Sequence, residues 1–207
     1  MRVQAAGLEG ELNVPAAATG VVIFAHGSGS SRHSPRNRYV AGVLNEGGLA
    51  TLLIDLLNAD EQALDLETAQ LRFDITFLAD RLVAITQWMR DQPRMQGLKI
   101  GYFGASTGAG AALVAAAGLP RLIHAEVSRG GRPDLAGDAL ERVDAPTLAI
   151  VGGADPVVLD LNRQALAQMN CVKQLHVIPG AGHLFEEPGA LAEVATLARD
   201  WFAENFR

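Results

Sequence analysis

The sequence predicts an α/β fold built on a doubly wound, mostly parallel β-sheet with helices on both faces. Two observations predict it. Short β-rich apolar runs alternate with longer segments of helical periodicity, and the runs are apolar along their whole length, as strands buried on both sides are. The expected strands span residues 21–24, 51–54, 100–103, 122–127, 148–151 and 175–178.

The segments between these strands show the spacing of apolar residues that is typical of helices. Because ligands bind beyond the carboxyl ends of the strands in such sheets, we expect functional residues in the loops that follow the strands. A hairpin is expected at 2–14, before the first parallel strand. The expected helices span residues 37–46, 68–91, 107–117, 159–169 and 189–204.

The composition indicates a single domain, 1–207. The chain has 207 residues, of which 49% are hydrophobic, and this is enough for one sizeable core with little left for a second. The formal net charge of −6 argues against a nucleic-acid partner, since such proteins usually carry a basic patch. The lone Cys171 excludes an internal disulfide and is compatible with a reducing compartment, so we expect the protein in the cytoplasm.

No segment resembles a signal peptide or a membrane span. Residues 1–10 lack a continuous apolar stretch and a small-residue cleavage site. The longest apolar stretches, 51–57 and 109–117, fall well below the roughly 18 residues that a membrane helix needs. We therefore expect a soluble protein with no membrane partner.

The strand expected at 100–103 is followed by G-A-S-T-G, residues 104–108, and then by a helix of small residues. This G-x-S-x-G pattern predicts a nucleophile elbow. In such an elbow a sharp strand-to-helix turn exposes the serine hydroxyl, and side chains two residues away from the serine would collide. The alternative is a glycine-rich packing turn with an incidental serine. Ser106 is the candidate nucleophile.

A serine hydroxyl is a weak nucleophile and needs a base that a third group orients. Asp155 follows the strand at 148–151, and His183 follows the strand at 175–178, which is the chain order expected after such an elbow. Taken alone, Asp155 is also compatible with a turn or a helix N-cap, and His183 with a structural hydrogen bond in a glycine-rich loop. The joint arrangement with Ser106 favours a catalytic triad.

Acyl transfer also needs hydrogen-bond donors for the developing oxyanion. The backbone N–H of Thr107, directly after the nucleophile, is the first candidate. We expect the backbone N–H of Ser28 to be the second, because the H-G-S-G loop at 26–29 follows the first parallel strand. A glycine-rich loop could also cradle phosphate, but the sequence has neither a G-x-x-x-x-G-K nor a G-x-G-x-x-G pattern.

Two arginines follow the strand at 122–127. Arg129 and Arg132 are candidates to face the active-site mouth and bind a substrate carboxylate in planar, bidentate geometry. The alternative is a structural ion pair with a nearby acid such as Asp134. We expect no metal and no organic cofactor, and we assign no role to Cys171.

Several motifs together resemble the dienelactone-hydrolase-like branch of the α/β hydrolases, and the similarity covers nearly the whole chain. They are H-G-S-G at 26–29, G-A-S-T-G at 104–108, S-R-G-G-R-P-D at 128–134, G-G-A-D at 152–155 and G-A-G-H-L-F-E-E-P at 180–188. The motifs at 128–134 and 180–188 resemble those of a narrower group, which is related to hydrolase domains fused to phosphoribosyltransferases. We expect no such second domain in 1–207. The resemblance implies the α/β-hydrolase fold, and we expect it here without a lid domain. Dienelactone hydrolase itself uses a cysteine nucleophile, whereas this elbow carries Ser106, which favours ordinary ester hydrolysis.

The sequence therefore predicts a serine carboxylic-ester hydrolase, of the carboxylesterase type, that acts through an acyl-enzyme on a small-molecule ester. The stretch 127–147 is too short for a helical lid, so we expect an open cleft suited to small or aryl esters. Dienelactone, other lactone or thioester hydrolysis is the nearest alternative, because pocket shape sets the substrate while the triad stays the same. A non-catalytic binding module of the same fold is the more distant one. The sequence leaves the oligomeric state open, and a homodimer is one of the alternatives.

Overall fold

Eight strands form one mixed sheet in the computed structural model, which describes residues 2–207. The sheet order is β1-β2-β4-β3-β5-β6-β7-β8, in which β1 and β2 are antiparallel to their neighbours and β3 to β8 are parallel. The N-terminal hairpin and the expected parallel strands are confirmed. The strands are β1 Arg2–Ala5, β2 Leu8–Asn13, β3 Gly20–Ala25, β4 Ala50–Ile54, β5 Lys99–Ala105, β6 Ile123–Arg129, β7 Thr147–Gly152 and β8 Lys173–Ile178.

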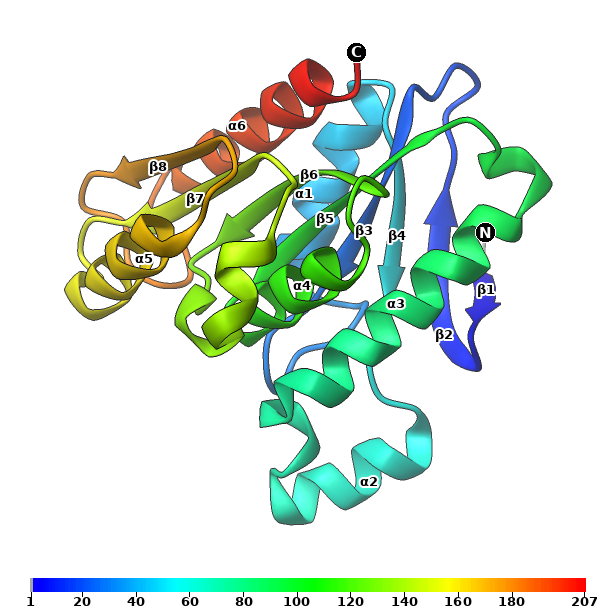
Figure 1. The fold of residues 1–207 in the computed structure, drawn as a ribbon, viewed down its shortest axis with the longest axis horizontal. Coiled ribbons are helices and arrows are strands. Elements are labelled where there is room, and N and C mark those ends of the chain that lie inside the picture. The colour runs from blue at the N-terminus through cyan, green and yellow to red at the C-terminus, as the bar shows by residue number, and fades with distance from the viewer. Residues whose placement is uncertain (1) are drawn as a thin grey trace.

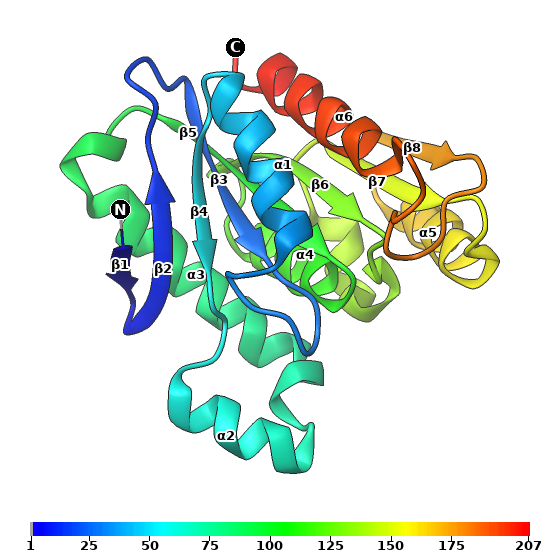
Figure 2. The same ribbon diagram turned by 180° about the vertical axis from the view of Figure 1, so that it is seen from behind.

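Helices cover both faces of the sheet, as the doubly wound class requires. The helices α1 and α6 lie on one face, and α3, α4 and α5 lie on the other (Figures 1 and 2). Within residues 2–207, none of the helices combines the length and the apolar character that crossing a bilayer demands. The bounds are α1 Pro35–Glu46, α3 Ile75–Asp91, the 3₁₀ turn η2 Pro93–Met95, α4 Thr107–Gly118, the 3₁₀ segment η3 Pro133–Arg142, α5 Pro156–Gln168 and α6 Ala190–Asn205.

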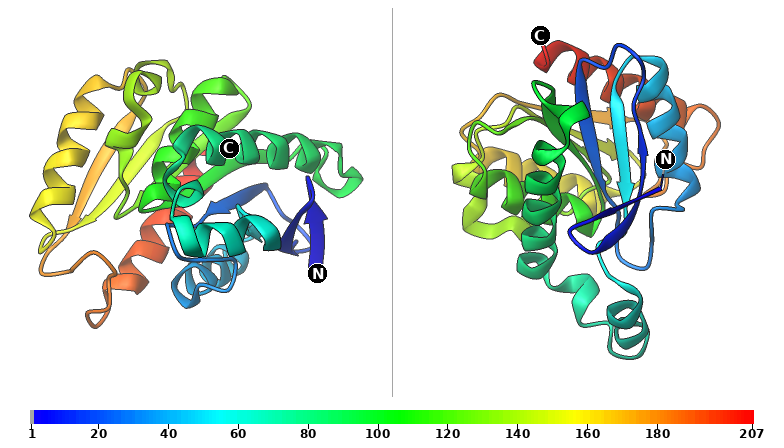
Figure 3. Two further views of the ribbon diagram at one scale, coloured as in Figure 1. Left: turned by 90° about the horizontal axis from the view of Figure 1, so that it is seen from below. Right: turned by 90° about the vertical axis from the view of Figure 1, so that its right-hand side faces the viewer.

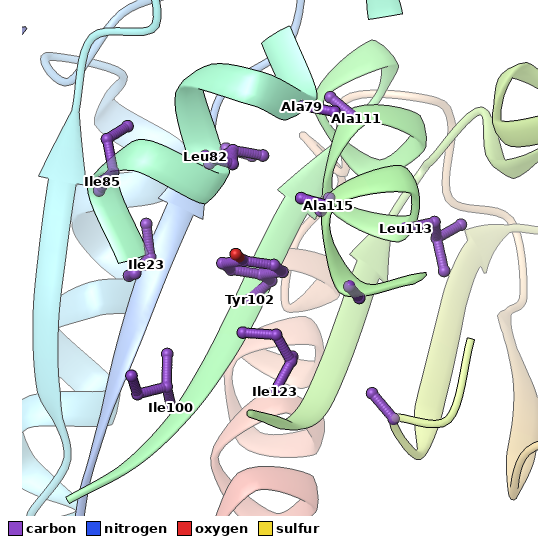
Figure 4. Packing of buried hydrophobic residues seen from close by; sticks show 14 of the residues in the cluster. Ile23, Ala79, Leu82, Ile85, Ile100, Tyr102, Ala111, Leu113, Ala115 and Ile123 are labelled. Atoms are coloured by element: carbon purple, nitrogen blue, oxygen red, sulfur yellow. The ribbon is translucent and has the colours of Figure 1, made fainter. Parts of the chain in front are cut away.

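Two apolar layers hold the helices to the sheet. Tyr102 of β5 is fully buried beneath α3 and α4, where its hydroxyl oxygen lies 2.6 Å from that of Thr86 (Figure 4). On the other face, Phe24 and Phe103 pack under α1 and α6 with their ring centroids 4.8 Å apart. Small residues such as Ala115 let α4 approach the sheet closely. Because the serine loop joins β5 to α4, close packing fixes both of its ends.

The helix expected at 68–91 is wrong in its first part. A separate helix, α2 Ala59–Thr68, ends at the first of these residues, the 3₁₀ turn η1 Leu71–Phe73 follows it, and α3 begins only at Ile75. A capping box starts α2: the Asn58 side chain accepts from the Glu61 N–H, and the Glu61 side chain accepts from the Asn58 N–H. The helix projects from the body of the molecule beyond the carboxyl end of β4 (Figures 1 and 3). This places a separate piece of chain beside the end of the sheet where ligands bind.

Candidate active site

The turn between β5 and α4 holds Ser106 in a backbone conformation that side chains rarely adopt, with φ 50° and ψ −123°. A Cβ atom at Gly104 would lie 2.4 Å from the Cα of Ala109, and a Cβ at Gly108 would lie 2.3 Å from the carbonyl oxygen of Ala25. Both positions therefore need glycine for steric reasons. The elbow geometry expected from the sequence is present.

The main chain of Ser106 is held firmly while its hydroxyl is left free. The Ser106 N–H donates to the Arg129 carbonyl at 3.3 Å, and the Ser106 carbonyl accepts from the Arg132 N–H at 3.0 Å. The residue is half-buried, and its side chain caps no amide of α4. Among residues 2–207, the Ser106 hydroxyl therefore has no hydrogen bond that a substrate would have to displace.

His183 and Asp155 meet at the carboxyl ends of β7 and β8. Nδ1 of His183 lies 2.8 Å from Oδ2 of Asp155. A carboxylate accepts, so this bond puts the imidazole proton on Nδ1 and leaves Nε2 able to act as a base. Oδ1 of Asp155 accepts from the Val158 N–H at 3.4 Å, which makes Asp155 the N-cap of α5 as well. The sequence left open whether Asp155 is a helix N-cap or the partner of the histidine, and in the structure it is both.

The turn after β6 lies between the serine and the histidine. A Cβ atom at Gly130 would lie 3.5 Å from Nδ1 of His183, and the residue before it binds the Ser106 N–H. The His183 loop is held by Glu187, whose Oε1 accepts from the Gly182 N–H at 2.9 Å. Within residues 2–207 no hydrogen bond joins the Ser106 hydroxyl to His183. Such bonds often tighten only when substrate is bound.

His26 ties the loop after β3 to the end of β4. Its Nε2 accepts from the Leu56 N–H at 3.1 Å, so the ring proton is on Nδ1, which lies 3.0 Å from the Gly27 carbonyl oxygen. Burial lowers the pKa of His26, and the ring is therefore kept neutral in this tautomer. A Cβ atom at Gly27 would lie 3.1 Å from the Cβ of Ser106. The H-G pair thus lets the loop pack directly against the candidate nucleophile.

One of the two expected oxyanion donors is free and the other is engaged. Thr107 is the first residue of α4, so its N–H has no acceptor within the helix. The Ser28 N–H donates to the hydroxyl of Thr107, with 2.9 Å between N and Oγ1. Ser28 therefore lies beside the elbow, but its amide binds a side chain that had no expected role.

A pocket of about 570 Å³, its open mouth included, extends from Thr107 and the loop at 26–31 toward α2 and η1. Arg72 lines this pocket and was missed in the sequence, because the region was assigned to one long helix. Its Nε binds the Asp65 carboxylate at 2.6 Å and its Nη2 binds the Asp65 carbonyl at 2.8 Å, while Nη1 lies toward Gly29. Four leucines provide apolar surface: Leu56, Leu57, Leu66 and Leu78.

The two candidate substrate-binding arginines have different surroundings in the structure. Arg132 forms a bidentate ion pair with Asp134, at 2.9 Å from Nε and 2.7 Å from Nη2. Arg129 is 8% exposed, and its Nε and Nη1 groups have no hydrogen-bond partner among residues 2–207. Burial lowers the pKa of Arg129 to about 10, and the charge of Arg36 adds to this effect. The residues that line the pocket include neither of these arginines, and they also do not include Ser106, Asp155 or His183, which the pocket adjoins through Thr107.

The sequence matches a known protein family along nearly its whole length. The model of the Dienelactone hydrolase family matches residues 8–205. A provisionally named phosphoribosyl transferase of Mycobacterium tuberculosis, from strains CDC 1551 and H37Rv, is 60% identical over 197 residues. The match covers 95% of this chain and 43% of that protein, so the chain spans less than half the length of these curated relatives.

Solved structures give the same result. The crystal structure of a dienelactone hydrolase from Anabaena variabilis ATCC 29413 has a TM-score of 0.97 and 58% identity, over 100% of this chain and 99% of that chain. An α/β serine hydrolase without a lid, from Xanthomonas campestris, shares the fold with a TM-score of 0.79 at 21% identity, over 99% of this chain and 94% of that chain. The chain therefore belongs to the dienelactone hydrolase family and has the α/β-hydrolase fold.

Proposed function

We propose that the protein hydrolyses carboxylic esters through an acyl-enzyme on Ser106, with His183 as the base and Asp155 as the residue that orients it. The 2.8 Å contact between Nδ1 of His183 and the Asp155 carboxylate carries the proposal, together with the strained turn that exposes the serine hydroxyl. Membership of the family supports a hydrolase of ester or lactone bonds. The serine-based mechanism and the preference for esters go beyond that.

In the first half of the reaction, Nε2 of His183 accepts the Ser106 proton while the serine oxygen attacks the ester carbonyl. The N–H of Thr107, at the start of α4, binds the oxyanion that forms. His183 then gives its proton to the departing alcohol, and Ser106 is left acylated. In the second half, His183 takes a proton from water, which attacks the acyl group, and then gives this proton to the Ser106 oxygen as the bond to the acyl group breaks and the acid leaves. This cycle uses no metal or organic cofactor.

The pocket beside Thr107 supports a small or aryl ester as substrate. Leucine side chains on the walls of this pocket suit a ring or a short acyl chain. Lactones and thioesters are the nearest competitors, because the same three residues would cleave them. A series of p-nitrophenyl esters tests the size limit, and a rate that rises beyond about eight acyl carbons would contradict it.

The nucleophile is tested with p-nitrophenyl acetate and butyrate, using the wild type, Ser106→Ala and Ser128→Ala. Ser128 is a matched control, since it lies on β6, is 1% exposed and has a hydroxyl with no hydrogen-bond partner among residues 2–207. We expect Ser106→Ala to abolish both turnover and labelling by a fluorophosphonate probe, and Ser128→Ala to retain both. Equal turnover by the wild type and Ser106→Ala would mean that the mechanism is wrong and would favour a binding module.

A carboxylate on the substrate would meet Arg72 rather than Arg132. Each arginine is paired with a neighbouring acid, Arg132 with Asp134 and Arg72 with Asp65. Only Arg72 lines the pocket, where its Nη1 lies toward the loop at Gly29. Binding of a substrate carboxylate by Arg129 stays a prediction. We expect Arg72→Met to lower kcat/KM for an anionic ester more than for its neutral counterpart, and Arg132→Ala to affect both alike. A selective loss in Arg129→Met alone would overturn this assignment.

A further inference from the structure

The contact between Ser28 and Thr107 changes how an oxyanion can be bound at this site. The Ser28 amide does not face open space, because it donates to Oγ1 of Thr107 across 2.9 Å. Thr107 is 5% exposed, and it nevertheless lines the pocket together with the loop that contains Ser28. The hydroxyl of Thr107 therefore engages the Ser28 amide at the wall of this pocket.

This hydroxyl has a proton to give. A threonine oxygen can accept one hydrogen bond and donate another at the same time. Oγ1 of Thr107 accepts from Ser28, and its own O–H donates to no acceptor among residues 2–207. Thr107 is also the first residue of α4, so there is no preceding helical carbonyl for the hydroxyl to bond. The O–H is therefore available to a ligand in the pocket that Thr107 lines.

We propose that the Thr107 hydroxyl is an oxyanion donor, acting beside the Thr107 backbone N–H, while the Ser28 amide polarises this hydroxyl instead of binding the oxyanion. Hydrogen bonds in a chain strengthen one another, so an amide that donates to Oγ1 makes the O–H a better donor. No proton is transferred in this step: the tetrahedral oxyanion only gains a hydrogen bond. The inference rests on the proposed function, and it adds a residue to the same site.

The alternative is that the bond between the Ser28 N–H and the Thr107 hydroxyl exists only while no substrate is bound. In that case the Thr107 side chain rotates away when substrate binds and releases the Ser28 N–H for the oxyanion. The two roles predict opposite effects of removing the hydroxyl. A donor is lost in the first case, whereas in the second case the Ser28 amide becomes available without any rotation.

The experiment compares Thr107→Val, which has the same shape but no hydroxyl, with Thr107→Ser, which keeps the hydroxyl. We expect Thr107→Val to lower kcat for p-nitrophenyl butyrate by about 100-fold to 1,000-fold with little change in KM, as loss of one oxyanion donor does. Thr107→Ser should rescue kcat. Inhibition by phenylboronic acid, whose adduct on the serine is tetrahedral, should weaken in Thr107→Val and recover in Thr107→Ser.

The matched control is Thr147→Val, which removes another buried threonine hydroxyl, one that donates to the Ala145 carbonyl at 2.9 Å. It should leave kcat unchanged. If Thr107→Val does not fold, Thr107→Ala gives the same readout. An unchanged or higher kcat in the valine variant, or an equal loss in the serine variant, would overturn the inference. Neither result touches the proposed function, which fails only if the wild type shows no turnover that depends on Ser106.

Discussion

Glu126 provides a sharp test of the structure away from the site. It lies in the middle of β6, it is 0% exposed, and neither of its carboxylate oxygens has a hydrogen-bond partner among residues 2–207. Burial raises the pKa of Glu126 well above its ordinary value of 4.5. At neutral pH this carboxyl is therefore either kept neutral or held charged at a cost in stability.

The pH dependence of this effect has a definite sign and slope. The folded protein binds the Glu126 proton more tightly than the unfolded chain does, so the stabilising effect of that proton is complete below about pH 4.5 and is lost as the pH rises toward the folded-state pKa. In this window the free energy of unfolding should fall by about 1.4 kcal/mol per pH unit because of Glu126.

The assay is urea denaturation of the wild type and Glu126→Gln at several pH values from 5 to 8. Glutamine keeps the shape and cannot titrate, so the difference in unfolding free energy should move in favour of the variant as the pH rises. Glu204→Gln, at an exposed position on α6, is the control and should run parallel to the wild type. If Glu126→Gln also runs parallel to the wild type, the buried position of this carboxyl is wrong.

Two further predictions concern the elbow and the loop after β3. Gly104→Ala, at the end of β5, should cost several kcal/mol of stability or prevent folding, because its Cβ would lie 2.4 Å from the Cα of Ala109. Gly118→Ala, at the end of α4, is the control, since a Cβ there meets no atom within 4 Å; thermal melting of both variants measures the difference. Burial lowers the pKa of His26, so the unfolded chain binds this proton more tightly than the folded protein does. The free energy of unfolding should therefore fall as the pH drops below about 6.5. Protonation of the folded form would also remove the hydrogen bond from the Leu56 N–H. Denaturation of the wild type and His26→Gln at pH 5 and 7.5 tests it, and identical slopes for the two proteins would contradict it.

The elbow could be predicted because its cause is local. A strand, a turn too tight for side chains at positions 104 and 108, and a helix of small residues occur in one short stretch of sequence, and steric exclusion leaves few other conformations for it. Asp155 and His183 follow the same logic, since each stands directly after a strand and parallel strands end at the same edge. The contact between them follows from the topology of the sheet.

The pocket could not be predicted, because its two walls are distant in the sequence. The periodic pattern at 68–91 hid the break at η1, although Asn58 and Glu61 form a capping box that marks the start of α2. The bond from Ser28 to Thr107 joins residues 79 apart, and no local pattern indicates where a loop amide will point. For Arg132, the choice between substrate and Asp134 was open in the sequence, and geometry favoured the neighbour two residues away.

The segment made of α2 and η1 has a consequence for the evolution of such a protein. Its internal bonds, from Arg72 to Asp65, close the segment on itself, and the capping box secures its start. Ser106, Asp155 and His183, the three residues of the proposed triad, all come from other parts of the chain, so substitutions in this segment leave them where they are. Selection for a new substrate can therefore act on one short stretch of the gene, while mutations that harm the chemistry fall elsewhere and are removed independently.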